Sequence, residues 1–209
     1  MFTAMLNKAY KTIRPKILYF GTPVALITTL DEQGNPNIGP MSSVWALGYK
    51  LVLGLGCNGK TFSNLINQKE CVINLPSVGL HENIEKIARL TGMNPVPEEK
   101  QALYKFEKDK FSAGGFKKMH SQMVQSPSIK DCPLQLEAVF ESYSVLEYDD
   151  DGNPDTAAVT VEVINVRAHE DIITGDNHIN PEHWSPLIYN FRHYYGLGKY
   201  LGKTFKAEV

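Results

Sequence analysis

The chain has 209 residues, of which 43% are hydrophobic and 21% are charged, the balance of an ordinary globular protein. Its formal net charge of -2 and the absence of a dense Lys/Arg run argue against a nucleic-acid partner, which would require a basic face. A chain of this length buries roughly 70% of the surface that its unfolded form exposes, so its core needs no disulfide or metal to be stable.

Cysteine usage and the N-terminal sequence both indicate the cytoplasm. The three cysteines, Cys57, Cys71 and Cys132, are odd in number, and no two of them have the spacing of a metal site or a redox pair. Such usage is typical of a reducing compartment. The first 20 residues are interrupted by four basic side chains, and no segment approaches the roughly 18 apolar residues of a membrane span. We therefore expect a cytoplasmic protein with no signal peptide and no membrane partner.

Strand signals dominate the first quarter of the chain. A short apolar run rich in Val, Ile and Thr predicts a strand over residues 23–30, and a return strand over residues 37–47 and another strand over residues 50–55 are expected to follow. A glycine and a proline between the first two runs predict a hairpin turn over residues 31–37. Gly39, with the proline after it, marks a bulge or a sheet edge. The fold is therefore expected to start with antiparallel strands.

A short helix is predicted after the third strand. Residues 61–69 have helix-forming composition, and Asn58 is the expected N-cap. Residues 71–75 then predict a buried strand that Pro76 ends. Strand, helix and strand thus follow one another within residues 50–76.

The middle of the chain, residues 80–130, is predicted to be a helical and irregular insert. Residues 81–90 and 98–108 have helix-forming composition and are separated by glycine and proline. Residues 111–130 show little periodicity and are expected to run irregularly over the surface. Irregular segments of this length are often functional.

The clearest strand pattern comes after the insert. Apolar and polar residues alternate from Leu134 to Phe140, and a turn over residues 149–154 leads into a second alternating segment over residues 159–163. Antiparallel hairpins on both sides of a helical insert predict a mainly β fold with peripheral helices. We expect a small, antiparallel, Greek-key-like barrel that forms a single domain over residues 1–209.

One short motif points to phosphate binding. Residues 54–61, GLGCNGKT, match G-x-x-x-x-G-K-S/T, the phosphate loop of nucleotide hydrolases. Free backbone N–H groups, the positive end of the following helix and the charge of Lys60 would all attract a phosphate. A hydrolase also needs a repeating parallel βαβ sheet and a magnesium-binding Asp, and the sequence shows neither pattern clearly. A hydrolase and a plain glycine turn with a helix cap both stay open at this point.

Six segments, taken in order, carry a resemblance to a known family. They are PVALITT from Pro23, GPMSSV from Gly39, KT at Lys60 with NL at Asn64, CVINLP from Cys71, CPLQLE from Cys132, and PLIY from Pro186 with a tyrosine pair at Tyr194. Together they resemble the flavin reductase-like or flavoredoxin family of FMN-binding split-barrel proteins, over residues 20–200. The resemblance implies an FMN-binding split β-barrel, a homodimer with FMN near the subunit interface, and electron transfer between reduced nicotinamide, flavin and acceptors.

The resemblance also implies where the flavin lies. Lys60, Thr61 and Asn64 would bind the FMN phosphate, and the last two, three residues apart, share one helix face. The isoalloxazine ring would lie against residues 41–44, and Cys57 is expected to be a small buried residue rather than a redox thiol. Hydride transfer to flavin needs no acid–base residue, so no catalytic residue is predicted. The predicted cofactor-binding residues are Met41, Ser42, Ser43, Val44, Cys57, Asn58, Lys60, Thr61 and Asn64.

Two features bear on the cofactor and the electron donor. One phosphate-binding turn without a G-x-G-x-x-G pattern favours FMN over FAD. Many members of the family have a Gly-Asp-His stretch near the flavin, but the late region of this chain reads DGNP over residues 151–154 instead. NAD(P)H therefore stays open as the donor, and the redox partner is a small molecule or another protein.

The C-terminal tail, residues 184–205, is rich in aromatic side chains, which are enriched in interfaces. We expect it to lie near the partner's flavin in a homodimer. His178, His183 and His193 occur in and before this tail, but their spacing matches no compact metal site, so no metal is predicted.

The sequence therefore predicts an FMN-binding oxidoreductase, either an NAD(P)H:flavin reductase or a flavoredoxin-like electron carrier. The alternatives are a phosphate-loop nucleotide hydrolase and a flavin-binding module without catalytic turnover.

Overall fold

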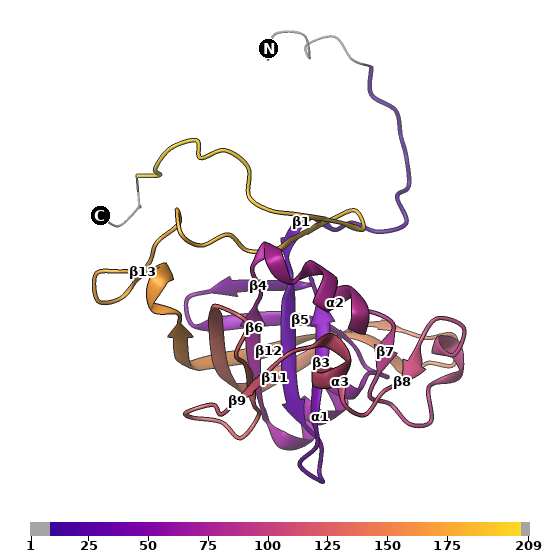
Figure 1. Ribbon diagram of the computed structural model, residues 1–209. Coiled ribbons are helices and arrows are strands. Elements are labelled where there is room, and N and C mark those ends of the chain that lie inside the picture. Colours follow the sequence, from indigo (N-terminus) through magenta and orange to yellow (C-terminus); the bar gives the residue numbers. More distant parts are fainter. Residues whose placement is uncertain (1–8, 206–209) are drawn as a thin grey trace.

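Seven strands form the main sheet of the protein, and every neighbouring pair is antiparallel (Figure 1). The structure is a computed structural model and describes residues 9–205. The mainly β fold with peripheral helices is confirmed. Across the sheet the strands are β3 (Pro36–Met41), β2 (Ala25–Leu30), β6 (Glu70–Leu75), β11 (Leu134–Tyr148), β12 (Pro154–Ala168), β5 (Lys50–Gly56) and β4 (Val44–Leu47).

The sheet curls until its two edges meet at one end. β3 and β4 are the opposite edges, yet only Ser42 and Ser43 separate them in sequence. The step from Met41 to Val44 spans at most roughly 11 Å, so the two edges must approach each other there. Among the described residues no hydrogen-bonded ladder joins β3 to β4. The sheet is therefore a barrel that is split between these two strands.

The inside of the curled sheet holds the main hydrophobic core. Strands near both edges contribute to one buried cluster, which is possible only if it lies within the curl. α1 (Lys60–Gln68) adds Leu65 to this cluster from one end of the sheet. Its members are Ala25, Ile27, Val44, Leu51, Leu53, Leu55, Leu65, Cys71, Ile73, Ala138, Ala157, Val159, Val161 and Val163.

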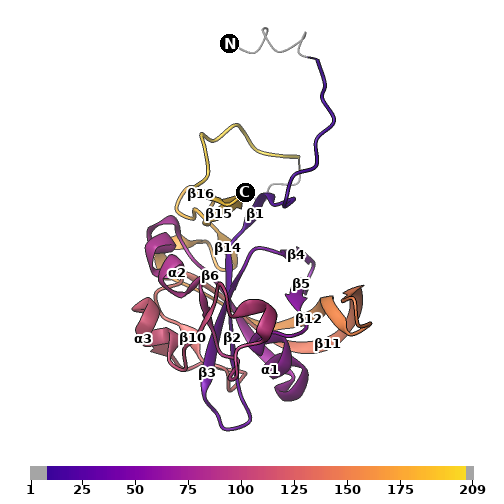
Figure 2. The same ribbon diagram turned by 90° about the vertical axis from the view of Figure 1, so that its right-hand side faces the viewer.

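A second core lies between the outer face of β2 and two helices. α2 (His81–Ile87) and α3 (Lys110–Gly114) pack on the same side of the sheet, beside β2 and β3 (Figure 2). β2 is therefore buried on both faces, which explains why its sequence, ALITTL, does not alternate between apolar and charged residues. The cluster consists of Val24, Leu26, Ile38, Ile84, Ile87, Phe111, Phe116, Ile129, Cys132 and Leu187.

The insert contains less helix than the sequence predicts. Residues 98–108 form only the 3-10 turn η3 (Glu98–Lys100) and then β8 (Lys105–Phe106), which pairs in parallel with β7 (Leu90–Thr91). The Lys105 N–H donates to the Arg89 carbonyl at 3.0 Å, so pairing with the preceding segment overrides helix propensity. The other short elements of the insert are η2 (Val78–Leu80), β9 (Lys118–Met119) and β10 (Ser128–Ile129).

Two details near the sheet edge also differ from the sequence prediction. The strand expected over residues 37–47 is two strands, because Ser42 turns the chain and donates a 2.9 Å hydrogen bond to the Pro23 carbonyl. Gly39 lies in an edge strand with regular pairing, so the edge is confirmed and the bulge is not present. The N-cap of α1 is Gly59 rather than Asn58.

The C-terminal tail pairs with the segment that precedes β2. β1 (Phe20–Pro23), β15 (Ile188–Asn190) and β16 (His193–Tyr195) form a three-stranded sheet, which Leu187 ties to the body through the second core. Beyond this sheet, residues 9–18 and 197–205 run outward from the body (Figure 1). No helix of residues 9–205 is long and apolar enough to cross a membrane. Between β12 and the tail come η4 (Glu170–Ile172), β13 (Ile173–Thr174) and β14 (His178–Ile179).

Candidate functional site

A cavity of about 260 Å³ lies between the first turn of α1 and strand β3. Lys60 and Thr61 line it from α1, and Lys100 and Lys110 line it from the insert. No carboxylate of the described residues is among its lining side chains. Three ammonium groups around one cavity without an acidic side chain favour an anionic ligand.

The N-terminus of α1 faces this cavity without a cap. Gly59 provides no side-chain hydrogen bond, and the first turn contains no acidic residue. The first helical hydrogen bond runs from the Ser63 N–H to the Gly59 carbonyl at 3.1 Å, so the preceding N–H groups have no partner within the helix. These groups and the helix dipole attract an anion, and α1 with nine residues is long enough for the effect.

Two glycines allow the walls of this cavity to approach closely. A Cβ on Gly39 would lie 2.2 Å from Thr61 Oγ1, so β3 can approach α1 only without a side chain there. A Cβ on Gly92 would lie 2.7 Å from Asn37 Oδ1 and 2.9 Å from Lys60 Cγ. Any larger residue at either position would push Lys60 and Thr61 away from the opposite wall of the cavity.

Asn37 connects β3 to α1 inside the cavity. Its Nδ2 donates a 3.1 Å hydrogen bond to Thr61 Oγ1. Its Oδ1 is buried and has no hydrogen-bond donor in the structure. A buried acceptor without a partner is costly, so this oxygen is suited to accept a hydrogen bond from a ligand.

The three predicted phosphate ligands do not lie together. Lys60 lines the cavity, and its Nζ is 3.9 Å from Asp31 Oδ2. Thr61 lines the cavity as well. Asn64 is 2% exposed and points to the sheet, where its Nδ2 donates to Thr29 Oγ1 at 3.0 Å. The placement of Asn64 therefore supports a structural role, because its amide is used to attach α1 to β2.

A second cavity, of about 290 Å³, adjoins the first at Pro40, Ala88 and Tyr104. It lies beside the point where β3 turns toward β4, so Met41 and Ser42 line one wall. Its other walls are strongly aromatic, with side chains from the N-terminal segment, the insert and the tail. The tyrosines are Tyr19, Tyr104, Tyr189 and Tyr194.

Three of these tyrosines, Tyr19, Tyr189 and Tyr194, are fixed by ring contacts and hydrogen bonds. The rings of Tyr19 and Tyr189 meet edge to face, with centroids 5.5 Å apart. Tyr194 donates its hydroxyl to Glu85 Oε2 at 3.2 Å. Burial, together with the Glu85 carboxylate, raises the pKa of Tyr194 to about 12, so the phenol stays protonated. The second cavity therefore offers flat, uncharged walls to a planar ligand.

The residues predicted to contact the isoalloxazine ring differ in exposure and in partners. Ser42 shares a 2.8 Å hydrogen bond with the Thr22 hydroxyl, and Ser43 shares one of 2.7 Å with the Tyr19 hydroxyl. Val44 is buried in the inner core. Met41 and Ser42 line the second cavity, whereas Ser43 and Val44 do not.

Cys57 and Asn58 lie outside both cavities. Burial, with a contribution from Asp155, raises the pKa of the Cys57 thiol, which disfavours the thiolate that redox chemistry needs. The Asn58 side chain hydrogen-bonds to Glu99 and Lys100 of the insert. Asn58 therefore connects the loop before α1 to the insert, through a lysine that lines the first cavity.

The hydrolase hypothesis does not agree with the topology. Gly54 and Gly56 are part of strand β5 rather than of a loop that could surround phosphates. β5 and β6, on either side of α1, are not neighbours, and the pairs within the main sheet are antiparallel. The glycine-rich match is therefore a strand end and a helix start, and the nucleotide-hydrolase alternative is wrong. In the described part of the chain, no three His, Cys, Asp or Glu side chains are placed to bind a metal ion.

Comparison with known proteins identifies the family. The model of the flavin reductase like domain matches residues 17–198, most of the chain. The chain belongs to the flavin reductase like family. A curated relative in Bacillus subtilis (strain 168), named Uncharacterized protein YdfE, is 46% identical over 204 residues, which cover 97% of either chain. The family predicted from the sequence is thus confirmed, and the protein is a flavin-related oxidoreductase.

Solved structures confirm the split-barrel fold of this flavin reductase like protein. The flavoredoxin of Desulfovibrio vulgaris (Miyazaki F) has a TM-score of 0.75 and 19% identity, covering 95% of this chain and 99% of that chain. Nitrilotriacetate monooxygenase component B from Bacillus cereus has a TM-score of 0.73 and 17% identity, covering 93% of this chain and 100% of that chain. At these identities the likeness establishes the fold.

Asn37, Lys100 and Lys110 are among the residues that line the first cavity but are absent from the sequence-based site. Asn37 is read in the sequence as part of a hairpin. Lys110 is one of several lysines between residues 100 and 118, and nothing in their spacing marks it as buried. Lys110 reaches the cavity only because the insert packs against β3.

Proposed function

We propose that the protein is an FMN-dependent oxidoreductase of the flavin reductase or flavoredoxin type. The observation that carries this proposal is the pair of joined cavities, one lined by lysines at an uncapped helix start and the other lined by tyrosines. FMN has the matching polarity, with a dianionic phosphate at one end and a planar ring at the other. Lys60 and Thr61 bind the phosphate, and the ring lies toward Met41 and Ser42.

The flavin, when bound, supplies the redox chemistry, and the chain positions it. Lys60 and the first turn of α1 fix the phosphate end. The tyrosine-lined cavity provides the flat walls that orient a planar ring and limit access of water to it. The purified protein should be yellow, and a colourless protein that binds no added FMN would contradict the proposal.

The surroundings of Lys60 favour FMN over FAD. Beyond Lys60 the cavity continues into a further space of about 270 Å³, but Asp31 lines that continuation. Burial alone would raise the pKa of Asp31, but hydrogen bonds from Asn35 and Gln33 hold that pKa below its usual range, so the carboxylate is charged at neutral pH. A second phosphate group would meet this negative charge. Mass spectrometry of the released cofactor should show FMN, and FAD alone would overturn the assignment.

The electron donor in this proposal is NAD(P)H or a redox protein. The absence of the Gly-Asp-His stretch argues that NAD(P)H reduces the bound flavin only weakly. Anaerobic mixing of the FMN-loaded protein with NADH or NADPH, followed by flavin absorbance, distinguishes the two donors. Bleaching by either nucleotide within seconds supports a flavin reductase. Bleaching only with a reduced protein or dithionite supports an electron carrier, and FMN that no protein partner oxidises or reduces would support a non-catalytic binding module.

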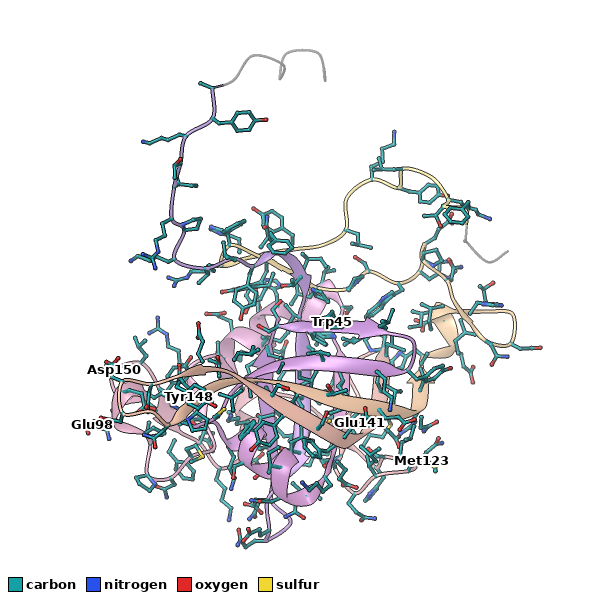
Figure 3. All side chains as sticks on the ribbon, turned by 180° about the vertical axis from the view of Figure 1, so that it is seen from behind. Trp45, Glu98, Met123, Glu141, Tyr148 and Asp150 are labelled. Carbon is teal, nitrogen blue, oxygen red and sulfur yellow. The ribbon has the colours of Figure 1, made fainter. Side chains whose placement is uncertain are left out.

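We propose a homodimer as the functional assembly. Apolar side chains are exposed on β4 and its turn, where Trp45 projects from the back of the sheet (Figure 3). The outward segments at both ends of the described chain expose further large apolar side chains. Such surfaces are typical of protein interfaces. The exposed residues are Tyr10, Ile13, Leu18, Trp45, Leu47, Tyr49, Tyr200, Leu201 and Phe205.

A further inference from the structure

Lys110 is a buried lysine at the start of α3. It is 4% exposed, and its Nζ donates a 2.9 Å hydrogen bond to the Ile38 carbonyl of β3. No carboxylate of the described residues forms an ion pair with it. An ammonium has three donor hydrogens, and burying its charge is costly unless it is paired.

Lys110 is one of the residues that line the first cavity. The titratable side chains that line that cavity are Lys60, Lys100, Tyr104 and Lys110, so the other charged side chains of its wall are also cations. Burial lowers the pKa of Lys110 to about 8, as expected for an ammonium in an apolar place without a counter-charge. An anion in the cavity would be the counter-charge that the chain itself does not provide.

Asn37 is an independent sign that the same space takes a ligand. The Asn37 Oδ1 is buried and has no hydrogen-bond donor. Asn37 is also the sequence neighbour of Ile38, whose carbonyl accepts the hydrogen bond from Lys110. An anion and a neighbouring hydroxyl group would satisfy Lys110 and Asn37 together. A phosphomonoester of a polyol, such as the ribityl phosphate of FMN, has both groups.

We propose that Lys110 is a second phosphate-binding lysine, which holds the phosphomonoester group of FMN together with Lys60 and the first turn of α1. The phosphate site is thus formed by α1 and the insert together. The identity of the ligand as FMN rests on the proposed function, whereas the phosphate site itself does not.

This role predicts a proton linked to binding. In the flavin-free protein Lys110 loses its proton as the pH rises past about 8, and a bound phosphate favours the charged form. Binding of FMN at a pH slightly above 8 should therefore take up a proton. Calorimetry in buffers with different heats of ionisation measures that uptake.

The test compares FMN with riboflavin, which lacks the phosphate, in Lys110→Met and Lys110→Gln. Met keeps the length of the side chain and Gln keeps a donor for the Ile38 carbonyl, so at least one variant is expected to fold. The Kd for FMN should rise about 10- to 100-fold in both variants, the usual effect of removing a charged hydrogen-bonding group. The Kd for riboflavin should change by less than about 3-fold, and the proton uptake should disappear. Lys117→Met, an exposed lysine of the same insert, is the control and should leave both constants unchanged.

Three results would overturn the proposal: an unchanged Kd for FMN, an equal loss for FMN and riboflavin, or proton uptake that persists in the variants. If the unaltered protein binds no flavin, the proposed function fails, and inorganic phosphate then tests the site alone. Phosphate that raises the Tm of the unaltered protein but not that of Lys110→Met still supports the phosphate site. Phosphate that stabilises both proteins equally, or neither, contradicts it.

Discussion

At the scale of single residues, the first cavity concentrates positive charge, and no acidic side chain is among the described residues of its wall. The Nζ of Lys60 lies 3.9 Å from Asp31 Oδ2, whereas Lys110 forms a hydrogen bond to a carbonyl but no ion pair among the described residues. Thr61 connects this charge to the sheet through the amide of Asn37. The three side chains are therefore expected to contribute differently to binding and to stability.

Replacing Lys60 and Thr61 by alanine should weaken FMN binding strongly. The double variant loses a charge and a hydroxyl group at the phosphate, and charge-assisted hydrogen bonds are the stronger ones, so the Kd should rise at least about 10-fold. Fluorescence titration with FMN measures the change. Lys60→Ala with Thr61→Ser is a useful comparison, because Ser keeps an acceptor for the Asn37 amide.

Asn64→Ala is the matched control on the same helix. It should lower the free energy of unfolding by about 1–3 kcal/mol, because the buried Thr29 hydroxyl loses its partner, but it should leave the Kd for FMN unchanged. A strong loss of FMN affinity in Asn64→Ala, with none in the Lys60 variants, would place the phosphate elsewhere.

Lys110 should also make the stability of the flavin-free protein depend on pH. Its folded-state pKa of about 8 lies below the value of roughly 10.4 for an unfolded lysine, so the unfolded chain binds more protons between these values. Stability therefore rises with pH in this window, by at most about 1.4 kcal/mol per pH unit from this group. Urea unfolding should show that, between about pH 8 and 10, the free energy of unfolding of the unaltered protein increases relative to that of Lys110→Met. A constant difference between the two proteins would contradict this expectation.

At the scale of elements, the tail from residue 184 divides into two parts with different roles. The first part contains Leu187, which is 2% exposed and belongs to the second core. It also contains β15 and β16, whose Tyr189 and Tyr194 line the second cavity. The second part, residues 197–205, runs outward and exposes Leu201 and Phe205 almost completely. Deleting the whole tail would therefore damage the core and any interface together.

A shorter truncation separates these roles. Deleting residues 197–209 should leave the fold and the tyrosine-lined cavity intact, because β16 ends at Tyr195. If these residues contact a second copy, the truncated protein should be a monomer with weaker FMN retention. Light scattering and the absorbance ratio of flavin to protein measure both effects. A full-length protein that is monomeric and fully loaded with FMN would contradict the role of the tail in assembly.

At the scale of the whole molecule, strand β2 joins the two cores. Its residues alternate between the inner cluster and the cluster under α2 and α3, so neither core can be lost without disturbing the other. We therefore predict that the chain unfolds as one domain in a single thermal transition. FMN at about 100 times its Kd should raise the stability by roughly 2.7 kcal/mol, since it binds the folded state alone. Calorimetry that resolves two transitions would contradict the single-domain prediction.

The sequence by itself determined the strand content, the antiparallel hairpins and the family. These follow from local patterns: alternation in β11 and β12, a mainly apolar segment without charged residues in β2, and turn residues between the strands. It also placed Lys60 and Thr61 at a helix start, where the structure has them, because a glycine turn followed by a helix is a local feature of the sequence.

The tertiary structure decided the rest of the site. The edges of the sheet meet at Ser42 only because seven strands curl, and β8 is extended because it pairs with β7. Asn64 shares the helix of Thr61 but its amide is used by the sheet, while Lys110, 50 residues after Lys60 in the sequence, reaches the same cavity. Burial and hydrogen-bond partners arise from contacts between distant segments, and a sequence pattern gives no direct measure of such contacts.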